Sequence, residues 1–411
     1  MFVQRDTWRV VASIRTVAVG AGALIFSITL TAIKARGAEP NYRDDGVGKP
    51  KFSVGPSVTN FSANATTIPY FRSQFTDPMN GHTYAYTMVG TDPAKGDQTT
   101  TIPVVIIPFR LTFTASVDPN FKTLDGSAKV VDTLNSPVFQ DSNVGGAADA
   151  TASAPPPLNA GRVVNEPDDI TQLGDAIYRA QWGNVGSDYH VRLGEPDVLA
   201  TQSFTVPSNL GVIVVGRSSH AHIGLLDDHW FTNRLYATIQ NLHIEPGTLP
   251  IILLYNTFLY TGHDLNNCCV LGFHGATTSL QGNGRQQVQT FMFASYSDQG
   301  IFAANPGDRE SFIADIHALS HEVQEWYDDP FVNNVVNPWL TPTAPQYGCT
   351  TILETGDPVV GYGFKIALNG EVYHPEDEVH FSWFARESPS RAEVQYYTYL
   401  NNFPTVAQGC Q

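Results

Sequence analysis

The sequence predicts a mixed α+β fold. β-Branched and alternating apolar runs indicate strands, of which Thr101–Phe109 is the clearest. In the second half of the chain, segments with helical spacing of apolar residues alternate with further strands. Helices are expected at 169–182, 227–242 and 308–329, and strands at 211–215, 249–255 and 288–295.

The 411 residues are enough for one large domain or two. We expect a β-rich N-terminal region at 39–145, a loop or linker at 146–165, and an α+β domain at 166–411. The linker prediction rests on an alanine-rich stretch that contains three consecutive prolines, Pro155–Pro157. Near the C-terminus, Asn369 and Gly370 lie between two apolar runs, which predicts a β-hairpin.

The charge balance limits the classes of partner. The chain has 39 acidic and 23 basic residues, and its formal net charge is -16. Phosphate groups would be repelled, so no nucleic-acid or anionic-membrane partner is expected. A low content of charged residues, 15%, with many Gly, Pro and aromatic residues fits a secreted, strand-rich globular protein.

Residues 1–38 have the pattern of an export signal. Arg5, Arg9 and Arg15 precede an uncharged apolar run at 16–33, and small residues at 35–38 offer a cleavage site. A retained N-terminal anchor is the alternative, because this run is near the lower length limit for crossing a bilayer. We therefore expect a secreted or periplasmic protein, with no membrane contact beyond this segment.

The four cysteines, Cys268, Cys269, Cys349 and Cys410, suggest two disulfides in an exported protein. A bond between adjacent cysteines is strained, so each of the first two is expected to reach a distant partner. The sequence then predicts that Cys349 pairs with Cys268 or Cys269, and that Cys410 pairs with the other.

The segment 308–329 has the pattern of a helix that carries a metal site. Asp308 is a plausible N-cap, Pro330 ends the helix, and an apolar stripe runs along it. His317, His321 and Glu325 are spaced four residues apart on the opposite face. An ordinary amphipathic helix with a solvated polar face is the alternative interpretation.

Helical rise decides which of these three side chains can share an ion. Four residues rise about 6 Å, so His317 and Glu325 lie roughly 12 Å apart along the axis, too far for bonds of about 2 Å to one metal. The pair His321 and Glu325 is preferred, because Glu322 follows the first ligand and is placed to act as general base. His317 is then expected near the ligands or in a structural role.

Further site residues are expected from elsewhere in the chain. Glu354 and Asp357, in a turn-like Glu-Thr-Gly-Asp segment, are candidates for the third ligand, although Asp357 could instead cap backbone amides. His274 and Tyr327 are candidates to line a cleft, although a lone His or Tyr is more often a packing residue.

Together these motifs resemble the zincin-like metallopeptidases, whose active helix carries His-Glu-x-x-His and packs on a mixed sheet. They resemble more closely a group of exported proteins with three patterns, found in this chain at Cys268–Ala276, Ser320–Pro330 and Glu354–Asp357. A fainter likeness is to plant exordium-like secreted proteins. The resemblance covers roughly residues 211–386. It implies a zincin-like fold and an export route, and hydrolysis less strongly.

This chain has Glu325 where the zinc peptidases have their second His. One His with two carboxylates leaves zinc with no net charge, which weakens the activation of water, and it shifts the preference toward calcium or manganese. Two functions follow. The first is a secreted zinc hydrolase, most simply a peptidase acting on peptide or protein substrates. The second is a non-catalytic binding or wall-associated protein with a structural ion.

Overall fold

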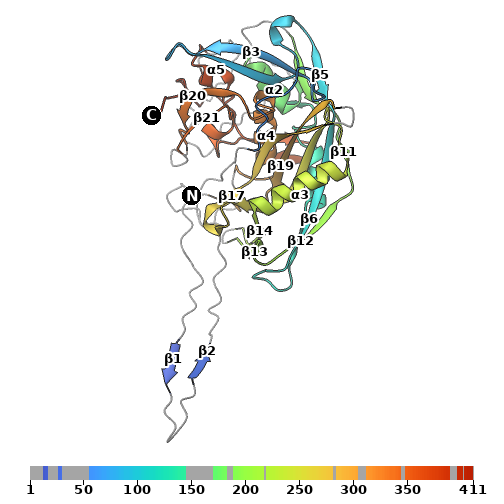
Figure 1. Ribbon diagram of the computed structural model, residues 1–411, viewed down its shortest axis with the longest axis vertical. Helices are drawn as coiled ribbons and strands as arrows, with labels where there is room; N and C mark the ends of the chain where they lie inside the picture. The colour runs from blue at the N-terminus through green and yellow to red at the C-terminus, as the bar shows by residue number, and fades with distance from the viewer. Residues whose placement is uncertain are drawn as a thin grey trace, which may run out of the picture.

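The computed structural model describes residues 55–144, 170–182, 188–216, 219–280, 284–303, 312–343, 348–388, 396–400 and 402–410. It also assigns two short strands near the N-terminus, β1 (Ser13–Thr16) and β2 (Phe26–Thr29), which pair antiparallel (Figure 1). The rest of the expected export signal at 1–38 and the whole predicted linker at 146–165 lie outside the described residues. Within the described residues, no helix has the length and apolar character needed to cross a membrane.

A seven-stranded mixed sheet forms the centre of the molecule. Its main path runs in the order β11 (Asp197–Val198), β6 (Val104–Phe113), β15 (Leu249–Tyr255), β19 (Gln286–Tyr296) and β18 (Gly272–Leu280). Strands β12 (Gln202–Val206) and β7 (Thr123–Asp125) also pair with β6. β6, β15 and β19 are parallel to one another, whereas β18 is antiparallel to β19. The fold is therefore mixed α/β.

Both faces of this sheet are buried, which explains the near-continuous apolar sequences of its strands. Along β6, Ile107 and Phe109 belong to one core cluster, whereas Val104 and Ile106 belong to another. The same alternation along β15 puts Ile252 with the first cluster and Ile251 with the second. Successive side chains of a strand point to opposite faces, so the two clusters are the two sides of the sheet.

One helix covers each face of the sheet. Helix α3 (Asp228–Asn241) contributes Phe231 and Leu235 to the first cluster, and it lies across the strands in Figure 1. Helix α4 (His317–Asp328) contributes Leu319, Val323 and Trp326 to the second cluster and packs on β18 and β19. The apolar stripe predicted for this helix therefore faces the core.

Helix α4 begins later than predicted. The expected N-cap, Asp308, lies outside the described residues, and residues 312–316 are not helical. The backbone of Asp315 has a φ of 43° and pairs with Ser297, and its carboxylate accepts a hydrogen bond from the Ile316 amide at 2.6 Å. Because the left-handed backbone conformation of Asp315 cannot be part of an α-helix, the helix starts only at His317.

Residues from both sides of the predicted linker share one sheet. Strand β6 belongs to the segment 39–145, yet it lies between β15 and β11 of the segment 166–411. The N-terminal segment also forms an antiparallel pair of its own, β3 (Tyr70–Thr76) and β4 (Thr83–Val89). The boundary at 146–165 thus does not separate two sheets.

The remaining strands form smaller sheets. A four-stranded sheet has the order β13 (Gly211–Val215), β14 (His222–Asp227), β16 (Thr257–Tyr260) and β17 (Cys268–Val270). Two-stranded pairs are β5 (Thr99–Ile102) with β10 (His190–Leu193), β8 (Ser142–Asn143) with β9 (Ile170–Thr171), and β20 (Val335–Leu340) with β21 (Cys349–Ile352). The other helices are α1 (Val130–Leu134), α2 (Leu173–Ala180) and α5 (Phe381–Ala385).

The predicted hairpin is confirmed. Strands β22 (Ile366–Leu368) and β23 (Glu371–Tyr373) pair antiparallel, with Leu368 opposite Glu371. Asn369 and Gly370 both have positive φ, 54° and 87°, as a two-residue type I′ connection requires.

The predicted disulfide pairing is wrong, although two disulfides are present. Cys268 bonds to Cys269, and Cys349 bonds to Cys410. The local pairing of strands explains the second bond. In the β20–β21 ladder Leu340 lies opposite Cys349, and the neighbouring Trp339 bridges to Gly409. Cys410 is thereby carried to Cys349, while Cys268 and Cys269 lie on β17 in another sheet.

Candidate metal centre

Helix α4 is buried on its polar side as well as on its apolar side. All twelve residues from His317 to Asp328 are buried. The alternative interpretation of a solvated polar face is therefore wrong. Buried ionisable groups need hydrogen-bond partners, opposite charges or a metal ion, because transfer out of water penalises their charged forms. The partners of this face come from β18, the turn at 354–357 and the segment 374–380.

His321 lies between two carboxylates. Its Nδ1 is 2.6 Å from Glu376 Oε2, and its Nε2 is 3.1 Å from Glu325 Oε2. A proton on Nδ1 donated to Glu376 leaves the lone pair of Nε2 directed toward Glu325. This is the arrangement of a metal-binding histidine, whose second nitrogen is held by a carboxylate. The 3.1 Å separation is close to the edge of a zinc tetrahedron, roughly 3.3 Å for bonds of about 2 Å.

The turn at 354–357 approaches the same pair. The amides of Gly356 and Asp357 donate to Glu325 Oε1 at 3.1 and 3.3 Å, which leaves Oε2 toward His321. Gly356 packs directly on the imidazole, since an added Cβ would lie 2.2 Å from His321 Nδ1. The glycine of the Glu-Thr-Gly-Asp segment is thus explained by close approach to His321.

Of the two candidate third ligands, the structure brings Asp357 to the pair. Ligand atoms of His321, Glu325 and Asp357 all lie within 4.8 Å of one another. Asp357 is the one member of this group that is partly exposed. Glu354 is buried and belongs to none of the metal-sized groups found among the described residues. Burial and the neighbouring Glu325 raise the pKa of Glu354 well above its ordinary value, which favours a neutral carboxylic acid.

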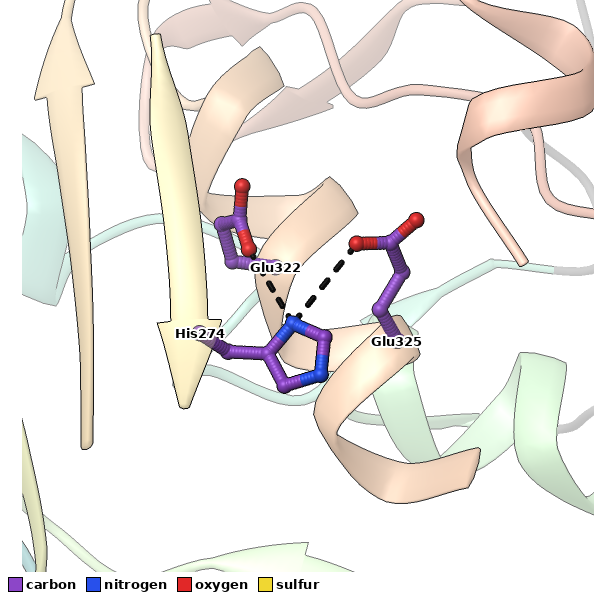
Figure 2. A group of neighbouring side chains, drawn as sticks. All are labelled: His274, Glu322 and Glu325. Atoms are coloured by element: carbon purple, nitrogen blue, oxygen red, sulfur yellow. Dashed lines mark hydrogen bonds and ion pairs between the residues drawn. The ribbon is translucent and has the colours of Figure 1, made fainter. Parts of the chain in front are cut away.

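His274 and Glu322 form a second pair beside the first (Figure 2). His274 projects from β18, and its Nδ1 lies 3.3 Å from Glu322 Oε2 and 3.7 Å from Glu325 Oε2. Glu322 projects from α4 and packs on Gly272 of β18, where an added Cβ would lie 2.5 Å from its Oε1. Burial raises the pKa of Glu322 to about 7, against the opposing effect of His274.

The other two candidates lie away from these pairs. His317 Nε2 is 3.4 Å from Glu376 Oε1 and is in no metal-sized group among the described residues. Tyr327 does not line the site. Its hydroxyl donates to the Val191 carbonyl at 3.2 Å, and its ring packs against Gly174 on α2. The predicted placement of Tyr327 in a cleft is therefore wrong.

Glu376 and Glu378 were not predicted from the sequence. Both are fully buried, and their ligand atoms lie within 4.8 Å of those of His321 and of each other. A signal was present in the sequence. His374, Glu376, Glu378 and His380 occupy every second position, so an extended chain would put all four on one face. All four are buried.

The balance of charge around α4 indicates that a cation fits this site. Carboxylates outnumber histidines, and the buried members are Glu322, Glu325, Glu354, Glu376, Glu378, His274, His317 and His321. Both oxygens of Glu378 are buried without a hydrogen-bond partner. Burial disfavours a charge on His321, yet Glu325 and Glu376 raise its pKa well above the ordinary value. Either a proton or a metal ion must therefore occupy Nε2 of His321.

Comparisons of the chain with protein-family models, curated proteins and solved structures gave no match. The resemblance to zincin-like proteins therefore stays an interpretation of the motifs.

Proposed function

We propose that the protein is an exported, zincin-like metal-dependent hydrolase, with peptides as its substrates. The ion, zinc or in its place calcium or manganese, would be held by His321, Glu325 and Asp357. One observation carries the proposal. His321 is fixed by Glu376 on one nitrogen and faces Glu325 with the other, at 2.6 and 3.1 Å. The packing of α4 on a mixed sheet is the arrangement that the resemblance implies.

Each group of the protein would then have a separate role in the reaction. A bound zinc ion acts as a Lewis acid that polarises a carbonyl and makes water more acidic. Glu322, one residue after His321 and beside His274, would accept a proton from the attacking water and later give it to the leaving amine. Gly356 and Glu376 would hold the imidazole of His321 in place, and the amides of Gly356 and Asp357 would orient Glu325.

A non-catalytic protein with a structural ion is the second candidate. The observation in its favour is burial. His321 and Glu322 are 0% exposed and Glu325 is 3% exposed, whereas a substrate must reach the ion. Asp357 is partly exposed. The hydrolase proposal therefore requires that the substrate reach the ion from the side of Asp357.

The test combines metal content with activity. Wild-type protein should contain metal, His321→Ala and Glu325→Ala should lose the ion of this site, and His317→Ala should keep it. Glu322→Gln should keep the ion bound at His321 while cleavage of a peptide library falls on the order of 100-fold, the scale of general-base loss. A metal-loaded wild type that cleaves no peptide would support the structural role. A wild type that binds no metal would refute both.

A further inference from the structure

The tautomer of His274 can be deduced from its surroundings. Its Nε2 lies 3.1 Å from the backbone carbonyl oxygen of Asp329, which can only accept a hydrogen bond. Nε2 therefore carries a proton and donates it. In neutral imidazole the other nitrogen, Nδ1, then has a free lone pair. His274 is 1% exposed, so no solvent reaches this lone pair directly.

This lone pair faces carboxylate oxygens. Figure 2 shows Nδ1 of His274 directed between Glu322 and Glu325, at 3.3 Å from Glu322 Oε2 and 3.7 Å from Glu325 Oε2. The second oxygen of Glu322, Oε1, is buried without a hydrogen-bond partner. A lone pair facing two buried carboxylates is repulsive, so a proton or a cation must lie between them.

The distances around Nδ1 of His274 fit a metal ion. Among the described residues, a His–carboxylate pair outside the site, His222 with Asp118, has an N–O distance of 3.1 Å. Three others are closer. These are 2.6 Å for His263–Asp227, 2.7 Å for His190–Asp175 and 2.5 Å for His374–Asp315. The His274 distances are longer than these. The two His274 distances are close to the separation of two ligand atoms in a zinc tetrahedron, roughly 3.3–3.5 Å for bonds of 2.0–2.1 Å.

We propose that His274 Nδ1, Glu322 and Glu325 hold a second divalent metal ion beside the ion at His321, with Glu325 bridging the two. Glu325 belongs to both metal-sized groups, one with His274 and Glu322 and one with His321 and Asp357. A bridging carboxylate places two ions about 3.5–4 Å apart, the spacing of two-metal hydrolytic centres. One imidazole with carboxylates suits a zinc or manganese ion.

This inference rests on the proposed function for the first ion and adds to it. Glu322 would bind through Oε2, which faces His274, and Oε1 would remain to accept a proton. Gly272 of β18 makes the room that this carboxylate needs, because any larger side chain would displace it. The charge of the second ion would also neutralise buried carboxylates whose negative charge a single ion would not balance.

The experiment counts zinc ions per chain. Full-length protein is stripped with a chelator, reloaded with excess Zn²⁺, desalted and measured by elemental analysis. We expect about two ions in the wild type and about one in each of His274→Gln and His321→Gln, with fewer in Glu325→Ala. His263→Gln serves as the matched control and should keep both, since His263 is an exposed histidine outside the site. Glu322→Gln is the second variant for the His274 side and should also keep about one ion.

Each outcome has a distinct meaning. One ion in the wild type, lost in His321→Gln and kept in His274→Gln, would overturn the second site and leave the first intact. Two ions in both His274→Gln and Glu322→Gln would show that these side chains are not ligands of the second ion. No ion in the wild type would overturn this inference together with the proposed function. Reloading with Mn²⁺ provides an independent readout, because bridged Mn²⁺ ions show spin coupling in electron paramagnetic resonance and separate ions do not.

Discussion

At the scale of single residues, two glycines of the candidate metal centre leave room for the side chains of His321 and Glu322. Gly356 lies against the imidazole of His321 and Gly272 lies against the carboxylate of Glu322. Neither contact involves a positive φ, so the requirement is for space and not for an unusual backbone conformation. A methyl group at either position would displace one specific side chain of the proposed site.

The Gly356→Ala variant tests this directly. Its Cβ would meet His321 Nδ1 and Cε1 at 2.2 and 2.4 Å, so the ring must turn away from Glu376 and Glu325. We expect zinc affinity at this site to fall about 10- to 100-fold, as when a supporting contact of a metal ligand is lost. Competition with a chromophoric chelator measures it. Gly409→Ala, where a Cβ meets nothing within 4 Å, is the control. Equal affinities in the two variants would refute the role of Gly356.

Glu376 is the second residue whose role can be isolated. Burial alone would raise its pKa, but His317 and His321 lower it to about 2, so it stays ionised and holds Nδ1 of His321. We expect Glu376→Ala to weaken zinc binding about 10- to 100-fold, with a smaller loss for Glu376→Gln, which still accepts a hydrogen bond. Glu371→Ala, an exposed carboxylate on β23, should leave the affinity unchanged. If Glu376→Ala binds zinc as the wild type does, Glu376 does not position His321.

Sequence reasoning found some of these residues and not others, for a physical reason. His321, Glu322 and Glu325 lie on one helix, where spacing alone predicts which side chains meet. Glu376 lies 55 positions after His321, and its contact depends on how an irregular segment folds back onto α4. The sequence could not decide whether Asp357 or Glu354 is the third ligand, because both lie in one turn. The orientation of this turn is fixed by the hydrogen bonds from its amides to Glu325.

At the scale of elements, α4 is fixed by its neighbours more than by its own sequence. Its start is set by Asp315, which forms a β-bridge with Ser297, the residue after β19. The carboxylate of Asp315 also accepts a hydrogen bond from the His374 amide at 2.8 Å. Helix α2 packs on its other side, where Gly174 lies against Tyr327. Helical periodicity predicted the body of α4, but it could not show these tertiary contacts at its ends.

The attachment of α2 to β10 predicts a pH dependence of stability. His190 on β10 lies 2.7 Å from Asp175 on α2, and this hydrogen bond raises the pKa of His190 against the effect of partial burial. A raised folded-state pKa adds stability that is fully present below the unfolded value of about 6.5 and is lost as pH rises through the folded value. The melting temperature of wild type should therefore exceed that of His190→Gln most at about pH 5 to 6, and the gap should narrow by about pH 9. A gap that stays constant over this range would contradict the assignment.

At the scale of the whole molecule, the central sheet brings distant parts of the chain to the candidate metal centre. β18 supplies His274, and α4 on the face of the sheet supplies His321, Glu322 and Glu325. The turn at 354–357 supplies Asp357, and the segment 374–380 supplies Glu376. Continuous apolar runs in the sequence predicted the buried strands β6, β15 and β19. The order of the strands in the sheet could not be predicted, because β6 pairs with β15, which is far from it in the chain, and such a pairing gives no local sequence pattern.

The most direct test of α4 as a metal-binding helix is anomalous diffraction at the zinc absorption edge from crystals of the full chain reloaded with zinc. We expect a peak about 2.0–2.2 Å from both Nε2 of His321 and a carboxylate oxygen of Glu325. Absence of a peak there, or a peak only at another place on the protein, would contradict the assignment of α4 as a metal-binding helix.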